Sequence, residues 1–446
     1  MQRDLTRGGV TRTMLLFALP MIAGNLLQQL YNIVDTLIVG QFLGSNALAA
    51  VGSAYTLMTF LTSVLLGLCM GSGAVFSILY GAQRREHLRR CVFVAFVLIG
   101  AAAVVLNALV LAFLDPILWL MRVPQETLPL MREYLWAVFW GICATFIYNF
   151  FACLLRAVGN SGAPLVFLAV SAVVNIVLDL WFVVGLQGGV AGAAWATVIA
   201  QALSGAGLAV YTAVRARDLL PSRADCRWDW KAVRELGQYS ALTCLQQSVM
   251  NFGILLVQGL VNSFGPAVMA AFAAAVKIDS FAYMPVQDFG NAFSTFVAQN
   301  HGAGRADRIR RGIRSAVACA VVFCAAVSAV VWVFARPLLC IFIQPHETEI
   351  LEIGIQYLHI EGAFYWGIGC LFLLYGLFRA VEKPGMSVVL TVISLGSRVA
   401  LAYLLSAIPA IGVAGIWWSV PIGWMLADIT GLAAYRRFQK KAAKPA

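Results

Sequence analysis

Two aspartates, Asp35 and Asp179, stand inside stretches of sequence that are otherwise almost entirely apolar. Asn175 precedes Asp179 by one helical turn, and Thr197 lies in the next apolar stretch. Two carboxylates that meet in a low-dielectric environment cannot comfortably both be ionised, so such a pair takes up a proton or binds a monovalent cation. Carboxylate, amide and hydroxyl oxygens are also suitable ligands for a hard cation such as Na+. The four residues are therefore a candidate H+ or Na+ site, and the alternative is that each aspartate bonds a neighbouring helix for packing alone.

The stretches that carry these residues have the length and composition of membrane-spanning helices. The 446 residues are 61% hydrophobic and only 11% charged, far from the usual soluble composition. A helix needs about 20 predominantly apolar residues to cross a bilayer. We therefore predict an all-α integral membrane protein, and twelve stretches qualify as spans: Thr13–Val39, Ala47–Leu79, Leu88–Phe113, Thr127–Leu154, Pro164–Val184, Val190–Val214, Val233–Val261, Val268–Val297, Ile313–Phe334, Ile350–Phe378, Met386–Ala407 and Gly412–Ala434.

The basic residues orient these spans. With the N-terminus in the cytoplasm, 26 of the 31 Lys and Arg residues fall on the cytoplasmic side. Cytoplasmic loops of membrane proteins carry such an excess, so we predict that both termini are cytoplasmic. The net charge of +11 then reflects membrane topology and requires no nucleic-acid partner.

The predicted topology places the candidate site at one depth. Asp35, Asp179 and Thr197 each lie roughly 8–12 Å below the extracellular end of their helix, from a rise of about 1.5 Å per residue. Tyr134 reaches a similar depth in the fourth span. Pro20, about four turns inward of Asp35, removes a hydrogen bond from the first span and is a candidate hinge or a static kink.

The chain is an internal duplication. YGAQRREHLRR (80–90) corresponds to HGAGRADRIRR (301–311) at an offset of 221 residues, and LLRAVGNSG (154–162) corresponds to LFRAVEKPG (377–385) at an offset of 223. Because each half has six spans, the repeats are parallel, and a substrate pathway in such carriers lies between them. We predict an N-terminal bundle at 1–214, a cytoplasmic linker at 215–234, a C-terminal bundle with a short basic tail at 235–446, and a central cavity.

The second half does not repeat the acidic set, since Gly253 and Ala402 stand where Asp35 and Asp179 would fall. Its own membrane-embedded charges form a separate group: Lys277, Asp279, Asp288 and Glu361. Lys277, Asp288 and Glu361 are candidates for lining a cavity of this half, and a structural ion-pair network is the equal alternative. Arg398 and Asp428 are better explained as structural residues or as residues near a helix end.

The ten cysteines never occur at a C-x-x-C spacing and fall mostly within predicted spans. They support neither a disulfide framework nor a metal site, and we interpret them as small buried hydrophobes. His87 and His301 are interpreted as solvated loop residues. The sequence contains no H-E-x-x-H motif, so an enzyme is not supported, and no cofactor is expected beyond the coupling ion.

Several motifs resemble those of the multidrug and toxic compound extrusion family. They are LPMIAGNLLQQLYNIVDTLIVGQFLG (19–44), the following ALAAVG, and the GA-x-R-x-x-x-x-RR loop found in both halves. The resemblance to its DinF-like branch implies a cation site at Asp35, Asn175, Asp179 and Thr197, with supporting polar or cavity residues at Gln28, Tyr31, Tyr134 and Asn149. The NorM branch uses carboxylates of the C-terminal half, and its seventh-helix position is occupied here by Gln246 and Gln247.

The resemblance implies a monomeric efflux carrier of the bacterial inner membrane, which exchanges drug-like, often cationic, compounds for H+ or Na+ by alternating access. A lipid or lipid-linked oligosaccharide flippase of the same superfamily is the main alternative. Its cavity needs cations for a pyrophosphate headgroup, and only Lys277 and Arg398 qualify. A major-facilitator carrier also has six plus six helices, but the loop after its second helix differs from GAQRREHLRR.

Overall fold

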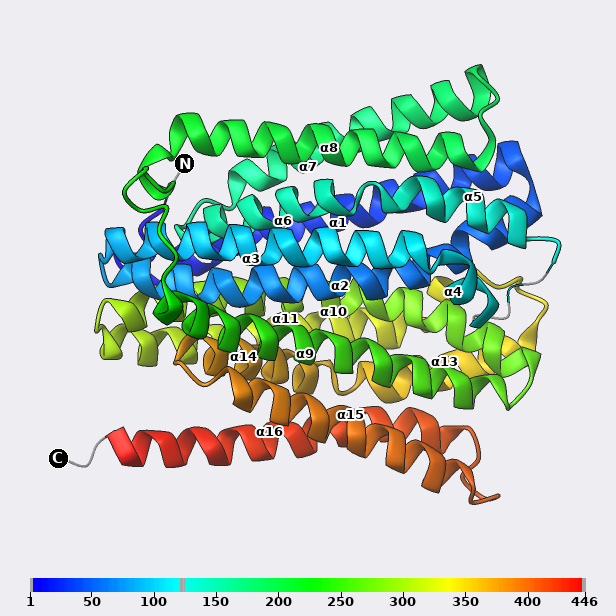
Figure 1. Cartoon of the computed structure of the whole chain (residues 1–446). Coiled ribbons are helices and arrows are strands. Elements are labelled where there is room, and N and C mark those ends of the chain that lie inside the picture. Colours follow the sequence, from blue (N-terminus) through cyan, green and yellow to red (C-terminus); the bar gives the residue numbers. More distant parts are fainter. Residues whose placement is uncertain (1–2, 121–122, 124, 443–446) are drawn as a thin grey trace. The chain divides into compact units, whose positions relative to one another are not determined.

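The computed structural model describes residues 3–120, 123 and 125–442, and within that part of the chain the regular structure is entirely helical. Figure 1 labels the elements in chain order. The first sequence half contains α1 (Val10–Leu43), α2 (Ser45–Gly81), α3 (Arg85–Ala112), α4 (Leu114–Leu120), α5 (Leu128–Phe139), α6 (Ile142–Ala157), α7 (Gly162–Asp179), the π-helical η1 (Leu180–Gly185) and α8 (Gly189–Arg215).

A short connection leads to the second half. It contains the single 3-10 turn η2 (Arg217–Leu219) and otherwise no helix before α9. The second half contains α9 (Trp230–Asn262), α10 (Pro266–Gly302), α11 (Ala306–Val333), α12 (Ala335–Leu339), α13 (Thr348–Gly362), α14 (Tyr365–Ala380), α15 (Pro384–Ser406) and α16 (Ala414–Ala442).

The duplication predicted from the motifs also appears in the helix lengths and in the backbone. Helices α2 and α10 both have 37 residues, and α3 and α11 both have 28. Residues with positive φ occur at equivalent turns of the two halves: Gly44 and Gly265, Gln83 and Gly304, Gly159 and Glu382, and Gly189 and Gly412. Because a positive φ is rare in residues other than glycine, four matched pairs show that the turns as well as the helices are repeated.

The expected spans all fall on helices. In the described residues nine helices are long and apolar enough to cross a membrane, and two bent helix pairs raise the number to eleven. The twelfth expected span corresponds to α16, whose 29 residues have sufficient length but include Pro421 and Asp428. The prediction of an all-α membrane protein with two six-helix repeats is confirmed.

Two expected spans are broken where the sequence suggested continuous helices. The fourth bends by 46° between α5 and α6, and the tenth bends by 50° between α13 and α14. At both breaks the hydrogen bonding tightens locally, because Gly141 N–H donates to the Val138 carbonyl and Phe364 N–H donates to the Glu361 carbonyl, three residues back. Since the bends occur at equivalent places in the two halves, they belong to the repeated architecture.

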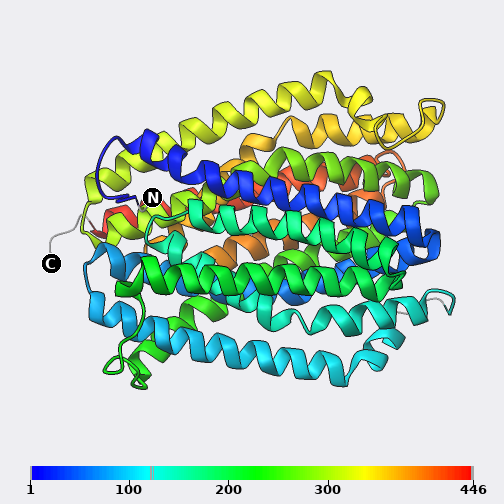
Figure 2. The same ribbon diagram turned by 90° about the horizontal axis from the view of Figure 1, so that it is seen from above.

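The helices form two compact units that we describe separately. Unit 1 contains Leu19–Cys244 and the segment ending at Leu5, and unit 2 contains Thr6–Ala18 and everything from Leu245 onward. The compact units and the sequence repeats therefore divide the chain at different places, within α1 and within α9. Inside each unit the long helices run roughly along one direction (Figure 2).

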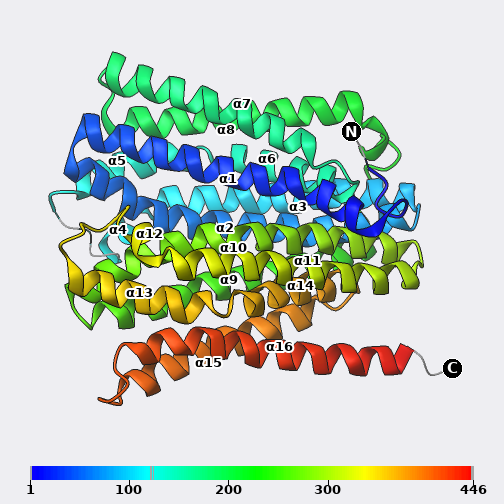
Figure 3. The ribbon, with the colours of Figure 1, turned by 180° about the vertical axis from the view of Figure 1, so that it is seen from behind.

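Each unit is held by close helix contacts and aromatic clusters. In unit 1, α7 and α8 lie side by side, as do α2 and α3 (Figure 3). Phe96, Phe146 and Phe150 form a ring cluster there with centroid separations of 5.2–5.8 Å. In unit 2, Phe272 and Trp417 stack at 5.5 Å. Such ring contacts add to the free energy of apolar burial.

Candidate cation site

Three helices of unit 1 carry the four predicted cation-site residues. Asp35 lies on α1, Asn175 and Asp179 on α7, and Thr197 on α8. A small residue allows α8 to approach η1 (Leu180–Gly185), the continuation of α7: a Cβ added to Gly192 would lie 3.2 Å from the Phe182 Cβ. Asp179 is the last residue of α7, and the helix then continues as the π-helical turn η1. Single π-turns of this kind occur frequently at functional sites.

The structure brings all four residues together. Asn175 Nδ2 donates to Thr197 Oγ1 across 3.4 Å, so the amide and the hydroxyl meet between α7 and α8. Thr197 Oγ1 in turn donates to the Ala193 carbonyl at 3.2 Å. Asp35 lies close enough to Asp179 for the charges of the two carboxylates to act on each other. Asn175 is 2% exposed and Asp179 is fully buried.

The oxygens of this cluster outnumber its donors. Within the described residues, no donor with good geometry reaches Asp35 Oδ1, Asn175 Oδ1 or either carboxylate oxygen of Asp179, all of which are buried. Each buried acceptor without a partner costs about 1–3 kcal/mol of stability. A set of four such acceptors can be satisfied by protons or by a cation. These oxygen ligands are therefore suited to binding H+ or a hard ion such as Na+.

Of the supporting residues, Tyr134 and Tyr31 both interact electrostatically with the acids. Tyr134, on α5, is 5% exposed and within electrostatic reach of both Asp35 and Asp179. Tyr31 lies one turn before Asp35 on α1, within electrostatic reach of that carboxylate. Asn149 points elsewhere, since its Nδ2 donates to the Thr145 carbonyl of its own helix α6 at 2.9 Å.

The predicted hinge residue lies beside a change of compact unit. Pro20 is inside α1, and residues up to Ala18 belong to unit 2 whereas those from Leu19 belong to unit 1. Proline removes one hydrogen bond from the helix at this place. The weakened turn therefore coincides with the point where α1 passes from one unit to the other.

In unit 2, the three residues proposed to line a cavity have different surroundings. Lys277 is exposed, and its Nζ lies 5.5 Å from the centre of the Phe342 ring. Asp288 is buried within α10. Glu361 is 1% exposed, and the charge that acts on it most strongly is that of Asp279 and not that of the lysine.

A buried polar cluster surrounds Asp279, which sequence reasoning did not select as a site residue. Tyr357 donates to Asp279 Oδ2 at 3.1 Å, and the Tyr365 hydroxyl donates to the other carboxylate oxygen. Arg398, interpreted above as structural, is the positive charge that acts on both acids of this cluster. The spacing of Tyr357 and Glu361, one helical turn apart, was the sequence signal that could have indicated a shared face.

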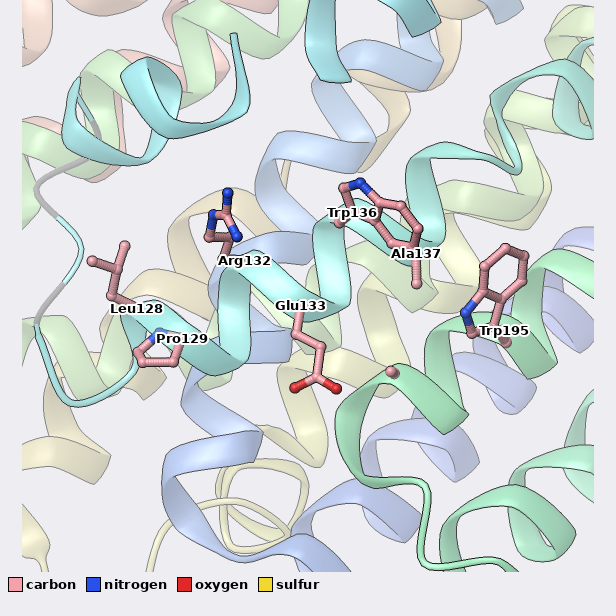
Figure 4. Close-up of a pocket in the computed structure, with 8 residues that line it drawn as sticks. Leu128, Pro129, Arg132, Glu133, Trp136, Ala137 and Trp195 are labelled. Carbon is pink, nitrogen blue, oxygen red and sulfur yellow. The ribbon is translucent and has the colours of Figure 1, made fainter. Parts of the chain in front are cut away.

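A separate pocket opens between the starts of α5 and α8 (Figure 4). Arg132, Glu133 and Trp195 contribute to its lining (Figure 4). Arg132 Nε donates to Asp115 Oδ1 at 2.6 Å on α4, and this bond lowers the pKa of the exposed Asp115 carboxyl below its usual value. None of the four cation-site residues lines this pocket.

Comparisons with known proteins agree with the duplicated architecture. The MatE family model matches the chain twice, over residues 20–181 and 242–404. A relative from Bacillus subtilis, named “Probable multidrug resistance protein YpnP”, is 29% identical over 99% of this chain and 98% of its own length. The DNA damage-inducible protein F of Escherichia coli is 25% identical over 94% of this chain and 91% of its own. A solved MOP superfamily transporter from Pyrococcus furiosus superposes with a TM-score of 0.92 at 22% identity, covering 99% of this chain and 98% of its own.

Proposed function

The chain belongs to the MatE family of membrane transporters, and from this premise we propose that it is a secondary active multidrug exporter coupled to H+ or Na+. Family membership makes it a multi-pass membrane transporter of small molecules and not an enzyme. Its relatives are named multidrug resistance and export proteins. The coupling ion, the direction of transport and the drug-like, often cationic, substrates are the proposed part.

The observation that carries the proposal is the acceptor-rich cluster of unit 1. Asp35, Asn175 and Asp179 together bury four oxygens that accept from no donor in the part of the chain that the structure describes. A buried acidic pair in a membrane bundle is energetically unfavourable unless it binds a proton or cation. We infer that ion binding at Asp35, Asn175, Asp179 and Thr197 stabilises one conformation of the bundle and thereby drives substrate release.

Ion binding can be converted into movement through α1. This helix carries Asp35 at the cluster and Pro20 at the change of compact unit. A ligand shifts a conformational equilibrium only as far as it binds one state better than the other. In our proposal the bound state satisfies Asp179 through the ion, and the unbound state satisfies it through a rearranged α1, with Pro20 as the hinge.

We further propose that the protein acts as a monomer in the bacterial inner membrane with both termini in the cytoplasm. The distribution of 26 of 31 basic residues on one side supports this orientation. A flippase for lipid-linked oligosaccharides receives less support. Its two candidate headgroup cations have other environments, since Lys277 lies against Phe342 and Arg398 acts on buried acids.

Inverted membrane vesicles allow the proposal to be tested. A fluorescent cationic dye is supplied outside, and its uptake is followed under an imposed proton gradient, then under a sodium gradient, at equal membrane potential. We expect uptake with one gradient and its loss when that gradient is collapsed. Uptake that depends on neither ion would contradict coupling.

A second preparation separates the alternatives. The purified protein in liposomes is given either the dye or a fluorescently labelled lipid. Dye movement without lipid movement supports the exporter. Lipid movement without dye movement under any gradient would replace our proposal with the flippase.

A further inference from the structure

His87, Cys91 and Glu235 converge at the end of unit 1 where α3 and α9 begin. His87 and Cys91 are one turn apart on α3, and Glu235 lies near the start of α9, 148 residues further along the chain than His87. His87 Nε2 lies 3.1 Å from Glu235 Oε2 and 3.8 Å from Cys91 Sγ. All three ligand atoms lie within 4.8 Å of one another. This arrangement corrects two interpretations from the sequence: His87 is helical and paired, and one cysteine does have metal-ligand neighbours.

The separations agree with those of a tetrahedral metal centre. Zinc bonds of about 2.0–2.1 Å to nitrogen and oxygen and 2.3 Å to sulfur imply N–O and N–S edges of about 3.3 and 3.6 Å. The two measured separations from His87, 3.1 and 3.8 Å, differ from these values by about 0.2 Å. The third pair, Cys91 Sγ and the Glu235 carboxylate, lies within 4.8 Å, so an inward shift of these side chains would place all three atoms around one ion. The set of one thiol, one imidazole and one carboxylate suits zinc and similar divalent transition metals.

Access and shape are also suitable. The side chains of His87 and Glu235 are 24% and 35% exposed, so an ion can reach them from water. Cys91 is fully buried and forms the base of the site. Three protein ligands leave a fourth position for water, and metal binding releases the thiol proton.

The second half of the chain provides an internal comparison. At the offset of 221 residues, His87 corresponds to Arg308 and Cys91 to Gly312. In unit 2, Arg308 donates to the backbone carbonyls of Gly8 and Arg7 at 2.6 and 2.7 Å, and so holds the segment that leads into α1. Both α3 and α11 thus hold the start of the first helix of the other sequence half. In unit 2 the hydrogen bonds of Arg308 make this connection. In unit 1 three side chains that can bind a metal lie at the equivalent place.

We propose that His87, Cys91 and Glu235 bind a divalent transition metal of the zinc class, and that the ion fastens the start of α9 to α3. The bound metal would link three side chains of α3 and α9, where His87 and Glu235 are already in contact with each other. We expect it to raise the thermal stability of the protein. The proposal does not depend on the coupling ion or the transported substrate.

Zinc binding to the purified protein, with its affinity tag removed, provides the test. We expect one zinc ion per chain that survives gel filtration in zinc-free buffer. We expect at least tenfold weaker binding in Cys91→Ala and in His87→Gln. Cys226→Ser is the matched control, because Cys226 is an exposed cysteine of the connection, and it is expected to bind as the unmodified chain does. Equal binding by Cys91→Ala and the unmodified chain would overturn the site.

Two further measurements do not require a folded variant. Cobalt added to the unmodified protein is expected to give a thiolate-to-metal absorption band, and its absence would exclude Cys91 as a ligand. Zinc is also expected to protect the Cys91 peptide from alkylation under mild denaturation while leaving the Cys226 peptide reactive. Equal alkylation of both peptides with and without zinc would contradict the proposal.

Discussion

Replacing Asp35 by asparagine is expected to stabilise the folded protein and to weaken ion binding at the same time. The amide of Asp35→Asn offers two N–H donors to Asp179, whose two oxygens accept from no donor among the described residues. A hydrogen bond to an ionised carboxylate contributes about 1.5–3 kcal/mol. The substitution also removes one of two adjacent negative charges, which relieves repulsion. Both effects favour the bundle without an ion.

The same bond opposes the ion, because a cation must displace the amide to reach Asp179. At about 1.4 kcal/mol for each factor of ten, the cost corresponds to roughly 10–100-fold weaker ion binding. Dye transport by proteoliposomes at a series of H+ and Na+ concentrations measures this as a shift in the half-saturating concentration. Asp115→Asn is the control, since the Asp115 side chain is 64% exposed and paired with Arg132. A half-saturating concentration within twofold of that of the unmodified chain would refute the coupling role of Asp35.

Three further substitutions test packing, the connection and the hinge. Gly71→Ala places a Cβ 2.5 Å from a backbone carbonyl oxygen of α9 and is expected to lower the free energy of unfolding, measured by thermal unfolding, by about 1–3 kcal/mol. Its control is Gly52→Ala on the same helix, where the added Cβ has no neighbour within 4 Å and the expected loss is less than about 1 kcal/mol. The bonds of Asp225 to a serine and to Arg89 hold the pKa of its carboxyl below the usual value. Their contribution to the stability of the fold is therefore present above about pH 4 and is lost as the pH falls through the lowered pKa. We expect the Asp225→Asn protein to unfold more easily than the unmodified chain at pH 7, with a difference in stability that shrinks in acid. Pro20→Ala restores a helix hydrogen bond and is expected to reduce the rate of dye transport several-fold while leaving the half-saturating ion concentration unchanged; an equal loss of ion affinity would contradict its role as a hinge.

The helices and the four-residue cluster follow from local rules, which explains why the sequence was sufficient to predict them. Span length is set by the thickness of the bilayer, and the one-turn spacing of Asn175 and Asp179 places both on one face of α7. Equal depth then predicted that Asp35 and Thr197 meet them. The contact between Asn175 and Thr197 was found where that reasoning placed it.

The Asp279 cluster depends on the bend between α13 and α14. In a straight helix, Tyr357 and Tyr365 are eight residues apart, which is about 12 Å along the axis. Both hydroxyls nevertheless reach Asp279, because the chain bends by 50° between α13 and α14. No proline marks this bend, so a pattern of helical periodicity could not reveal it.

The His87 site illustrates a second limit. The one-turn spacing of His87 and Cys91 was visible in the sequence, but their third partner, Glu235, is separated from His87 by 148 residues. Its position follows from the packing of the first half of α9 within unit 1, which the sequence repeat does not indicate. The repeat alone would assign α9 to the other half.

The two helices that pass between compact units are therefore unequal. Helix α1 carries both Asp35 and Pro20. Helix α9 contains no proline, and Gly253 stands in it at the position equivalent to Asp35. The part of α9 that belongs to unit 1 is closely packed as far as its last residue there: a Cβ added to Gly67 would meet the Cys244 Cα at 2.6 Å. Close backbone contact of this kind resists sliding, and a metal at His87 would resist it further. We therefore expect ion-driven movement to occur mainly in α1, with the start of α9 as the fixed reference.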